Sequence, residues 1–266
     1  MDNPYVRLTE AFNRERLRAL LSSGQAVVMH RLAIASKDGD WILREKEETT
    51  RHVLRTLAAR GSRYRFGAPL DPRWLAGGWS SHLEFRAEGL RLRTDFVTRP
   101  PRIERVELDR IWREADETGS ALLPLEPLAA IKLTDRERDY AVVGELARRM
   151  SDPRARLLYA RSSRDLIAMA KRHADLVEAL RAERPVLDAI PRGRDALDEA
   201  LDRERRTLMR ANEERLARYR RAYAGWAALW PEVHREIADL PLEEAHAIVV
   251  GRAEGVLPFA VTGEER

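Results

Sequence analysis

Hydrophobic and polar positions follow two different patterns along this chain, and the change falls near residue 150. Before it, short alternating or continuous apolar runs stand between helical segments, which indicates strands and helices in one α/β layer. After it, apolar residues recur every three or four positions and strand signals disappear. The pattern predicts a mixed α/β domain over residues 1–150, followed by an all-helical domain over residues 151–266.

The first sixty residues predict a leading helix and then alternating strands and helices. Gly61 is the expected C-terminal cap of the last of these helices, because glycine adopts the left-handed conformation readily. The predicted elements are a helix over 6–23, a buried strand over 26–29, a helix-like connection over 31–35, a strand over 38–43 and a helix over 47–60.

Residues 81–86 and 89–97 alternate apolar and polar positions around a short Ala-Glu-Gly link, which predicts a β-hairpin. In its second strand the apolar face carries Leu92 and Phe96, while Arg93 and Asp95 lie on the other face because strand side chains alternate. Asp95 is therefore expected on a polar face.

The remainder of the chain predicts helices over residues 104–115, from 125 to 146 with a break near 134, over 163–183, and over 195–230. Pro231 is expected to end the last helix. Its aromatic residues form either a stripe for a partner helix or ordinary core; these are Tyr219, Tyr223, Trp226 and Trp230.

Composition limits the classes of protein to which this chain can belong. The net charge of +4 comes from 48 basic and 44 acidic residues, so nucleic-acid binding is permitted but not indicated. The chain has no cysteine, which excludes disulfides and cysteine-based zinc or nucleophile chemistry. No stretch approaches the roughly 18 apolar residues of a membrane span, and we expect a soluble, cytoplasmic protein without a membrane partner.

Three aspartates are the main candidates for chemistry. Asp38 and Asp40 are two apart on a predicted strand, so both carboxylates project to one side. With Asp95 from a neighbouring strand they could bind a hard divalent cation, which prefers oxygen ligands. Alternatively, Asp38 and Asp40 are turn residues, since Asp-Gly is a strong turn signal.

The motifs also occur in an informative order. They are Val27-Val28-Met29, Lys37-Asp38-Gly39-Asp40-Trp41, the helix 53–61, Arg91-Leu92-Arg93-Thr94-Asp95, and residues 125–132 followed by 136–139. In this order, after a leading helix, residues 10–150 resemble the nucleotidyltransferase superfamily, the fold of DNA polymerase beta.

The resemblance implies a nucleotidyltransferase-like mixed sheet with Mg²⁺ (or Mn²⁺) at Asp38, Asp40 and Asp95. Asp95 would be the third ligand and the catalytic base for the acceptor hydroxyl. Where the family has a Gly-Gly or Gly-Ser phosphate turn, this chain has Met29-His30-Arg31, a degenerate turn. The nucleotide-binding residues are expected to be His30, Arg31, Lys132 and Arg136.

The function implied is transfer of a nucleotidyl group from an NTP to an acceptor such as RNA, a protein or a small molecule, as in some bacterial toxin–antitoxin systems. A second hypothesis is a catalytically silent member of the fold that binds a protein partner, or a second copy of itself, through its C-terminal helices. A third, an RNA-binding module built on arginine-rich helices, is disfavoured because acidic residues are interspersed among the arginines.

Overall fold

The computed structural model describes residues 3–261 and divides into two compact units. The first unit contains the chain up to Leu123 and again from Arg218 onward, and the second contains Pro124–Ala217. The boundary expected near residue 150 lies inside the second unit. The hydrophobic pattern does not show where the chain returns to the first unit, because its spacing stays helical there.

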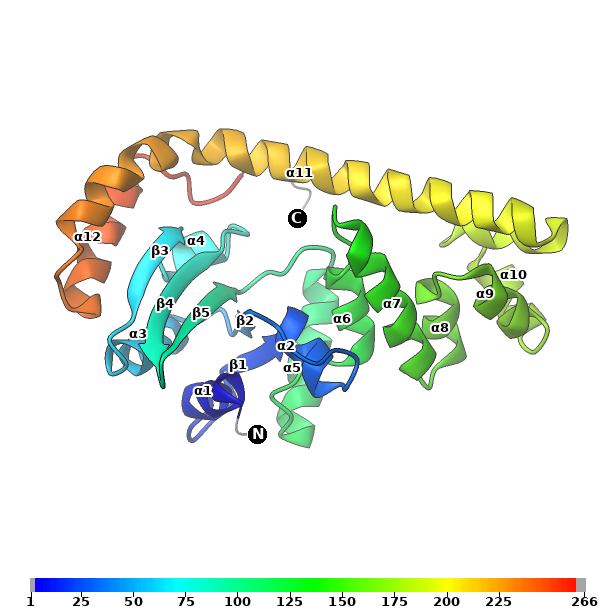
Figure 1. Cartoon of the computed structure of the whole chain (residues 1–266), viewed down its shortest axis with the longest axis horizontal. Coiled ribbons are helices and arrows are strands. Elements are labelled where there is room, and N and C mark those ends of the chain that lie inside the picture. The colour runs from blue at the N-terminus through cyan, green and yellow to red at the C-terminus, as the bar shows by residue number, and fades with distance from the viewer. Residues whose placement is uncertain (1–2, 262–266) are drawn as a thin grey trace. The chain divides into compact units, whose positions relative to one another are not determined.

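A five-stranded mixed sheet forms the centre of the first unit, which confirms the mixed α+β class (Figure 1). The strand order is β1-β2-β5-β4-β3, with β2 and β5 parallel and the other neighbours antiparallel. The strands are β1 (Ala19–Ser22), β2 (Asp38–Leu43), β3 (Arg63–Gly67), β4 (Ser81–Ala87) and β5 (Leu90–Val97).

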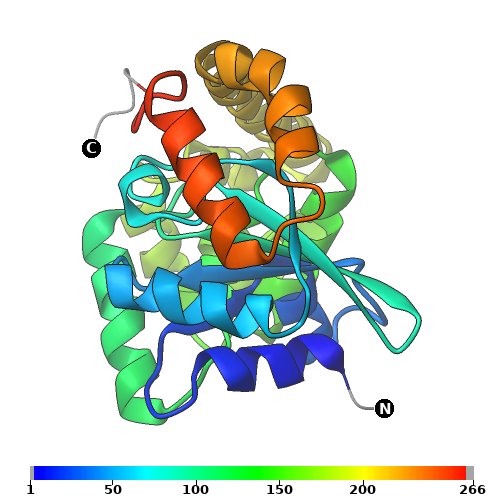
Figure 2. The ribbon, with the colours of Figure 1, turned by 90° about the vertical axis from the view of Figure 1, so that its left-hand side faces the viewer.

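Helices cover the apolar face of this sheet. Trp41 of β2 stacks on Phe96 of β5 with ring centroids 5.5 Å apart, and both are fully buried in a core with Phe12 and Trp226. Figure 2 shows α12 beside α3, and the two are in contact. The helices of this unit are α1 (Pro4–Phe12), α2 (Ser23–Met29), α3 (Glu47–Ala58), α4 (Pro72–Leu75), α5 (Arg105–Thr118), α12 (Leu242–Glu254) and the last part of α11 (Arg194–Glu236).

Three elements predicted at the start of the chain are wrong. The helix expected over residues 6–23 ends at Phe12, and Ala19–Ser22 form the buried strand β1, paired with β2. The side chain of Asn13 accepts hydrogen bonds from the amides of Arg18 and Ala19, which fixes the turn between helix and strand. Residues 26–29 are helical rather than extended, and residues 31–35 contain no helix. Strand β3 was not anticipated.

Five other elements of this unit match their sequence patterns, while α4 and α12 were not anticipated. Strand β2 has the predicted bounds, and α3 is followed by Gly61 at φ +63°, the left-handed conformation expected of its cap. The hairpin β4–β5 and helix α5 also form where they were predicted.

The second unit is a small helical bundle, as the helical pattern predicted. Its core includes Leu157, Leu166, Leu180 and Leu197, all nearly or fully buried. The expected break near residue 134 separates two helices, but the single helix expected over 163–183 is divided in two. The helices are α6 (Leu125–Ile131), α7 (Glu137–Arg149), α8 (Pro153–Tyr159), α9 (Ser163–Ala170), α10 (Ala174–Leu180), the 3₁₀ helix η1 (Pro185–Arg192) and the first part of α11.

Helix α11 does not end at Pro231 but continues to Glu236. Trp226, before the proline, and Val233, after it, are both fully buried in the core of the first unit, and this packing holds the helix on both sides of the missing amide donor. Trp226 Nε1 donates to the carbonyl of Gly67 at 2.9 Å, and the Tyr223 hydroxyl accepts from the Gly67 amide. The aromatic stripe is therefore core. No helix within residues 3–261 is long and apolar enough to cross a membrane.

Candidate functional site

A row of register partners crosses the sheet at the level of the aspartates. Ser22 of β1 pairs with Asp40 of β2, Asp40 with Asp95 of β5, Asp95 with His82 of β4, and His82 with Phe66 of β3. Paired positions on adjacent strands present their side chains to the same face. The pattern thus brings Asp40 and Asp95 together although they are far apart in sequence.

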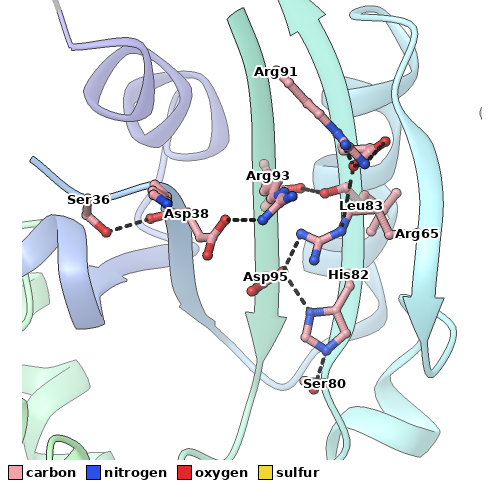
Figure 3. A network of polar contacts seen from close by, with 12 residues as sticks. Ser36, Asp38, Arg65, Ser80, His82, Leu83, Arg91, Arg93 and Asp95 are labelled. Carbon is pink, nitrogen blue, oxygen red and sulfur yellow. Dashed lines mark hydrogen bonds and ion pairs between the residues drawn. The ribbon is translucent and has the colours of Figure 1, made fainter. Parts of the chain in front are cut away.

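All three candidate aspartates lie on the face opposite the aromatic core. Trp41 and Phe96, the next residues after Asp40 and Asp95, stack on the core side, so both aspartates face the other way. Asp38 is two residues before Asp40 on β2 and shares its face. Figure 3 shows Asp38 and Asp95 within one network of polar contacts on this face.

The carboxylate of Asp95 is engaged by two neighbouring strands. His82 Nδ1 of β4 lies 2.7 Å from Asp95 Oδ1, and Arg65 Nη1 of β3 lies 3.7 Å from the same oxygen (Figure 3). Both partners are largely buried side chains. Asp95 is thus held in a fixed direction by a hydrogen bond and a nearby cation.

Asp38 and Asp40 lie near the start of β2. Arg93 Nη1 is 3.7 Å from Asp38 Oδ1, which is buried and has no hydrogen-bond partner among the described residues. The backbone carbonyl of Asp40 accepts a hydrogen bond of 3.1 Å from the Ser22 hydroxyl. An unsatisfied buried carboxylate oxygen is costly, so Asp38 retains capacity for another partner.

The three carboxylates do not form a metal site as they are arranged. Their chemistry suits a hard cation, and the orphaned oxygen of Asp38 is a vacant ligand atom. However, within residues 3–261 no group of three acidic, histidine or cysteine side chains is close enough to hold an ion. Asp95 Oδ1 also already accepts from His82. A shared ion would require these side chains to reorient.

The turn between the first strand and the following helix lies at Ser22-Ser23-Gly24. This is several residues before the His30-Arg31 position expected from sequence, because residues 26–29 belong to α2. Ser23 has φ +48°, and a Cβ on Gly24 would lie 2.2 Å from Ser36 Oγ, so the turn packs tightly on the segment that leads into Asp38. Sequence reasoning missed this turn; the Ser-Ser-Gly directly after two leucines was the available signal.

His30 and Arg31 lie at the C-terminal end of α2. His30 Nε2 is 3.0 Å from the carbonyl oxygen of Leu123, and Arg31 is exposed with φ +59°. Their contact with a nucleotide stays a prediction.

Lys132 and Arg136 belong to the second unit, at the break between α6 and α7. Lys132 Nζ is 4.0 Å from Asp139 Oδ1, and the Thr134 hydroxyl donates to Asp139 Oδ2 at 2.7 Å. Asp139 therefore fixes the local turn. Arg136 is the exposed N-cap residue of α7. Phosphate binding by Lys132 and Arg136 also stays a prediction.

Comparisons with known proteins identify no family. No protein-family model matches this chain, and no curated protein matches it significantly. A solved structure from H. pylori, described as a candidate nucleotidyltransferase, is similar over 79% of this chain and 95% of its own, with 14% identity and a TM-score of 0.36. A TM-score this low carries no conclusion about fold family or activity.

Proposed function

We propose that this protein binds an NTP on the acidic face of its sheet and acts as a nucleotidyltransferase. The observation that supports the proposal is the register pairing of Asp40 with Asp95 on the parallel strands β2 and β5, with Asp38 on the same face. The strand-to-helix turn at Ser22-Ser23-Gly24 supports it further, because Ser22 pairs with Asp40 at the adjacent position of β1. The proposal agrees with the motif order in the sequence.

Asp38, Asp40 and Asp95 are the residues proposed to hold Mg²⁺ or Mn²⁺, after Asp95 has released His82 and Asp38 has moved away from Arg93. Within residues 3–261 the carboxylates are not clustered closely enough to hold the ion without this rearrangement. His30, Arg31, Lys132 and Arg136 are proposed contacts for the nucleotide. The acceptor is RNA, a protein or a small molecule, and a toxin–antitoxin role is one setting for such a reaction.

The experiment is calorimetric titration of the full chain with each NTP, in the presence of Mg²⁺ and again with EDTA. We expect binding of at least one NTP with Mg²⁺ and loss of that binding with EDTA. Binding that is unchanged by EDTA would contradict the three-carboxylate site. No binding of any NTP under either condition would overturn the proposal.

A second function is favoured by the ion pairs on the same face. Arg65 lies 3.7 Å from Asp95 and Arg93 lies 3.7 Å from Asp38, so each of these two carboxylates already has a cationic partner. A catalytically silent protein that keeps the fold and binds a partner, or a second copy, through its C-terminal helices would need no free carboxylates. The aromatic stripe of α11 is not available for this role because Trp226 is fully buried. Absence of NTP binding, with a dimer seen by light scattering, would favour this second function.

A further inference from the structure

A continuous chain of hydrogen bonds joins a serine, a histidine and an aspartate on the polar face of the sheet. Ser80 Oγ lies 2.8 Å from His82 Nε2, and His82 Nδ1 lies 2.7 Å from Asp95 Oδ1 (Figure 3). Ser80 stands directly before β4, two residues before His82, and Figure 3 shows the two side chains meeting. Asp95 is the register partner of His82 on β5, and its carboxylate contacts the other nitrogen of the same ring.

This arrangement favours one tautomer of the histidine ring. A carboxylate at Nδ1 favours the tautomer whose proton lies on that nitrogen, which leaves the lone pair of Nε2 directed at the serine hydroxyl. A neutral imidazole in this tautomer is the form that accepts a proton from a serine. Ser80 is partly exposed, so a reagent can reach its hydroxyl.

The neighbouring strand fixes the ring in place. Phe66 of β3 stacks on His82 with ring centroids 4.3 Å apart and an interplanar angle of 20°. A Cβ on Gly67 would lie 2.5 Å from His82 Cδ2 and 2.7 Å from the carbonyl oxygen of Ser80. Gly67 also has φ +92°, a conformation that suits glycine. The absence of a side chain at Gly67 thus leaves space for the His82 ring and the Ser80 backbone.

We propose that Ser80 is an activated nucleophile, with His82 as its general base and Asp95 as the carboxylate that orients the base, and that it accepts acyl groups from activated esters. In the step, the Ser80 Oγ–carbon bond forms and the ester carbon–oxygen bond breaks. The serine proton moves to His82 Nε2 and then to the departing alkoxide. The reaction needs neither a metal nor a nucleotide. The proposal does not rest on nucleotidyl transfer, but the two use Asp95 differently: the serine needs the Asp95–His82 hydrogen bond, which ion binding by Asp95 would break.

The test is labelling of the full chain with a fluorophosphonate probe in EDTA, read by mass spectrometry of the Ser80 peptide. The probe forms a bond from Ser80 Oγ to phosphorus and loses fluoride, while the proton passes to His82. We expect labelling at Ser80 and none in Ser80→Ala. The Ser81→Ala variant is the matched control, because Ser81 is the adjacent serine on the opposite, fully buried face. It should label like the native chain.

Two further variants test the chain of hydrogen bonds from Ser80 through His82 to Asp95. His82→Gln should slow labelling by about 10²-fold or more, since general-base catalysis contributes that much. Asp95→Asn keeps the size of the side chain but favours the wrong tautomer, and should also slow labelling by more than about 10²-fold. Thermal melting of each variant confirms that it is folded. Absence of label at Ser80 in the native chain, or equal labelling rates in the native chain and a folded Asp95→Asn variant, would overturn the proposal, whatever the NTP titrations show.

Discussion

Asp40 and Asp95 are direct register partners across the parallel strands β2 and β5, on the face opposite the stacked pair Trp41 and Phe96. Because paired positions of neighbouring strands share a face, the backbone alone places these two carboxylates side by side. The side chains then find different partners, and Asp95 is held by His82. The backbone thus assembles an acidic row, while side-chain contacts determine what the row can bind.

Asp40→Asn should weaken Mg²⁺-dependent NTP binding by at least about tenfold, because loss of a charged ligand lowers metal affinity more than it disturbs a partly open site. The thermal midpoint should stay close to that of the native chain. Calorimetry and thermal melting measure the two effects. Glu84→Gln is the matched control, since Glu84 lies on the same face but pairs with Arg91 at 2.7 Å. Equal losses in the two variants would mean a general charge effect.

Lys132→Ala should weaken NTP affinity by roughly 10- to 100-fold, the worth of a hydrogen bond to a charged group, and leave metal binding intact. Lys132 also lies 4.0 Å from Asp139, so melting is followed to detect a stability effect. The exposed Lys171 of the same unit serves as control in Lys171→Ala. Unchanged NTP affinity in folded Lys132→Ala would remove Lys132 from the nucleotide site.

Glu204→Gln should destabilise the second unit by about 3–5 kcal/mol, the cost of leaving buried charges without their partner. Burial would raise the pKa of Glu204, but hydrogen bonds from Arg184 and the charges of Arg184 and Arg161 together lower it. Arg184, which is almost fully buried, donates to both carboxylate oxygens at 2.8 Å.

Urea unfolding measures this loss. The control is Glu178→Gln, which removes an exposed pair with Arg181, and pairs of this kind contribute only about 0–1 kcal/mol. Equal losses in the two variants would show that the buried network does not stabilise the bundle.

Stability should fall as the pH drops below about 6.5, in part because of His246. Burial lowers the pKa of His246 below its ordinary value of 6.5, and its Nδ1 lies 2.7 Å from the Tyr64 hydroxyl. Below pH 6.5 the unfolded ring binds a proton that the folded ring does not, so the free energy of unfolding decreases by up to about 1.4 kcal/mol per pH unit. The loss ends at the folded-state pKa.

Urea unfolding of the native chain and of His246→Gln at several pH values measures this contribution. The variant should show a shallower dependence of stability on pH than the native chain. His234→Gln, at an exposed position of α11, controls for removal of a histidine. An identical pH dependence in the native chain and His246→Gln would contradict the assignment.

Elements whose signals are local could be predicted from the amino-acid sequence alone. Alternation in residues 81–97 gave the hairpin and the polar side of Asp95, and the bounds of β2 followed from its apolar run. Helical spacing and the terminal glycine located α3. These predictions hold because strand alternation, helix periodicity and capping depend on neighbouring residues. Placing the three aspartates on strands was enough to anticipate that Asp38 and Asp40 share a face.

Tertiary structure decided whatever depends on a distant partner. Residues 19–22 are a strand because β2 lies beside them, although their spacing fits a helix. Competition between local preference and tertiary packing also makes residues 26–29 helical, and it places the first turn at Ser22-Ser23-Gly24. The return of the chain to the first unit at Arg218, and the passage of α11 through Pro231, depend on burial of Trp226 and Val233. Long-range burial overrides weak local preference because it removes far more apolar surface from water.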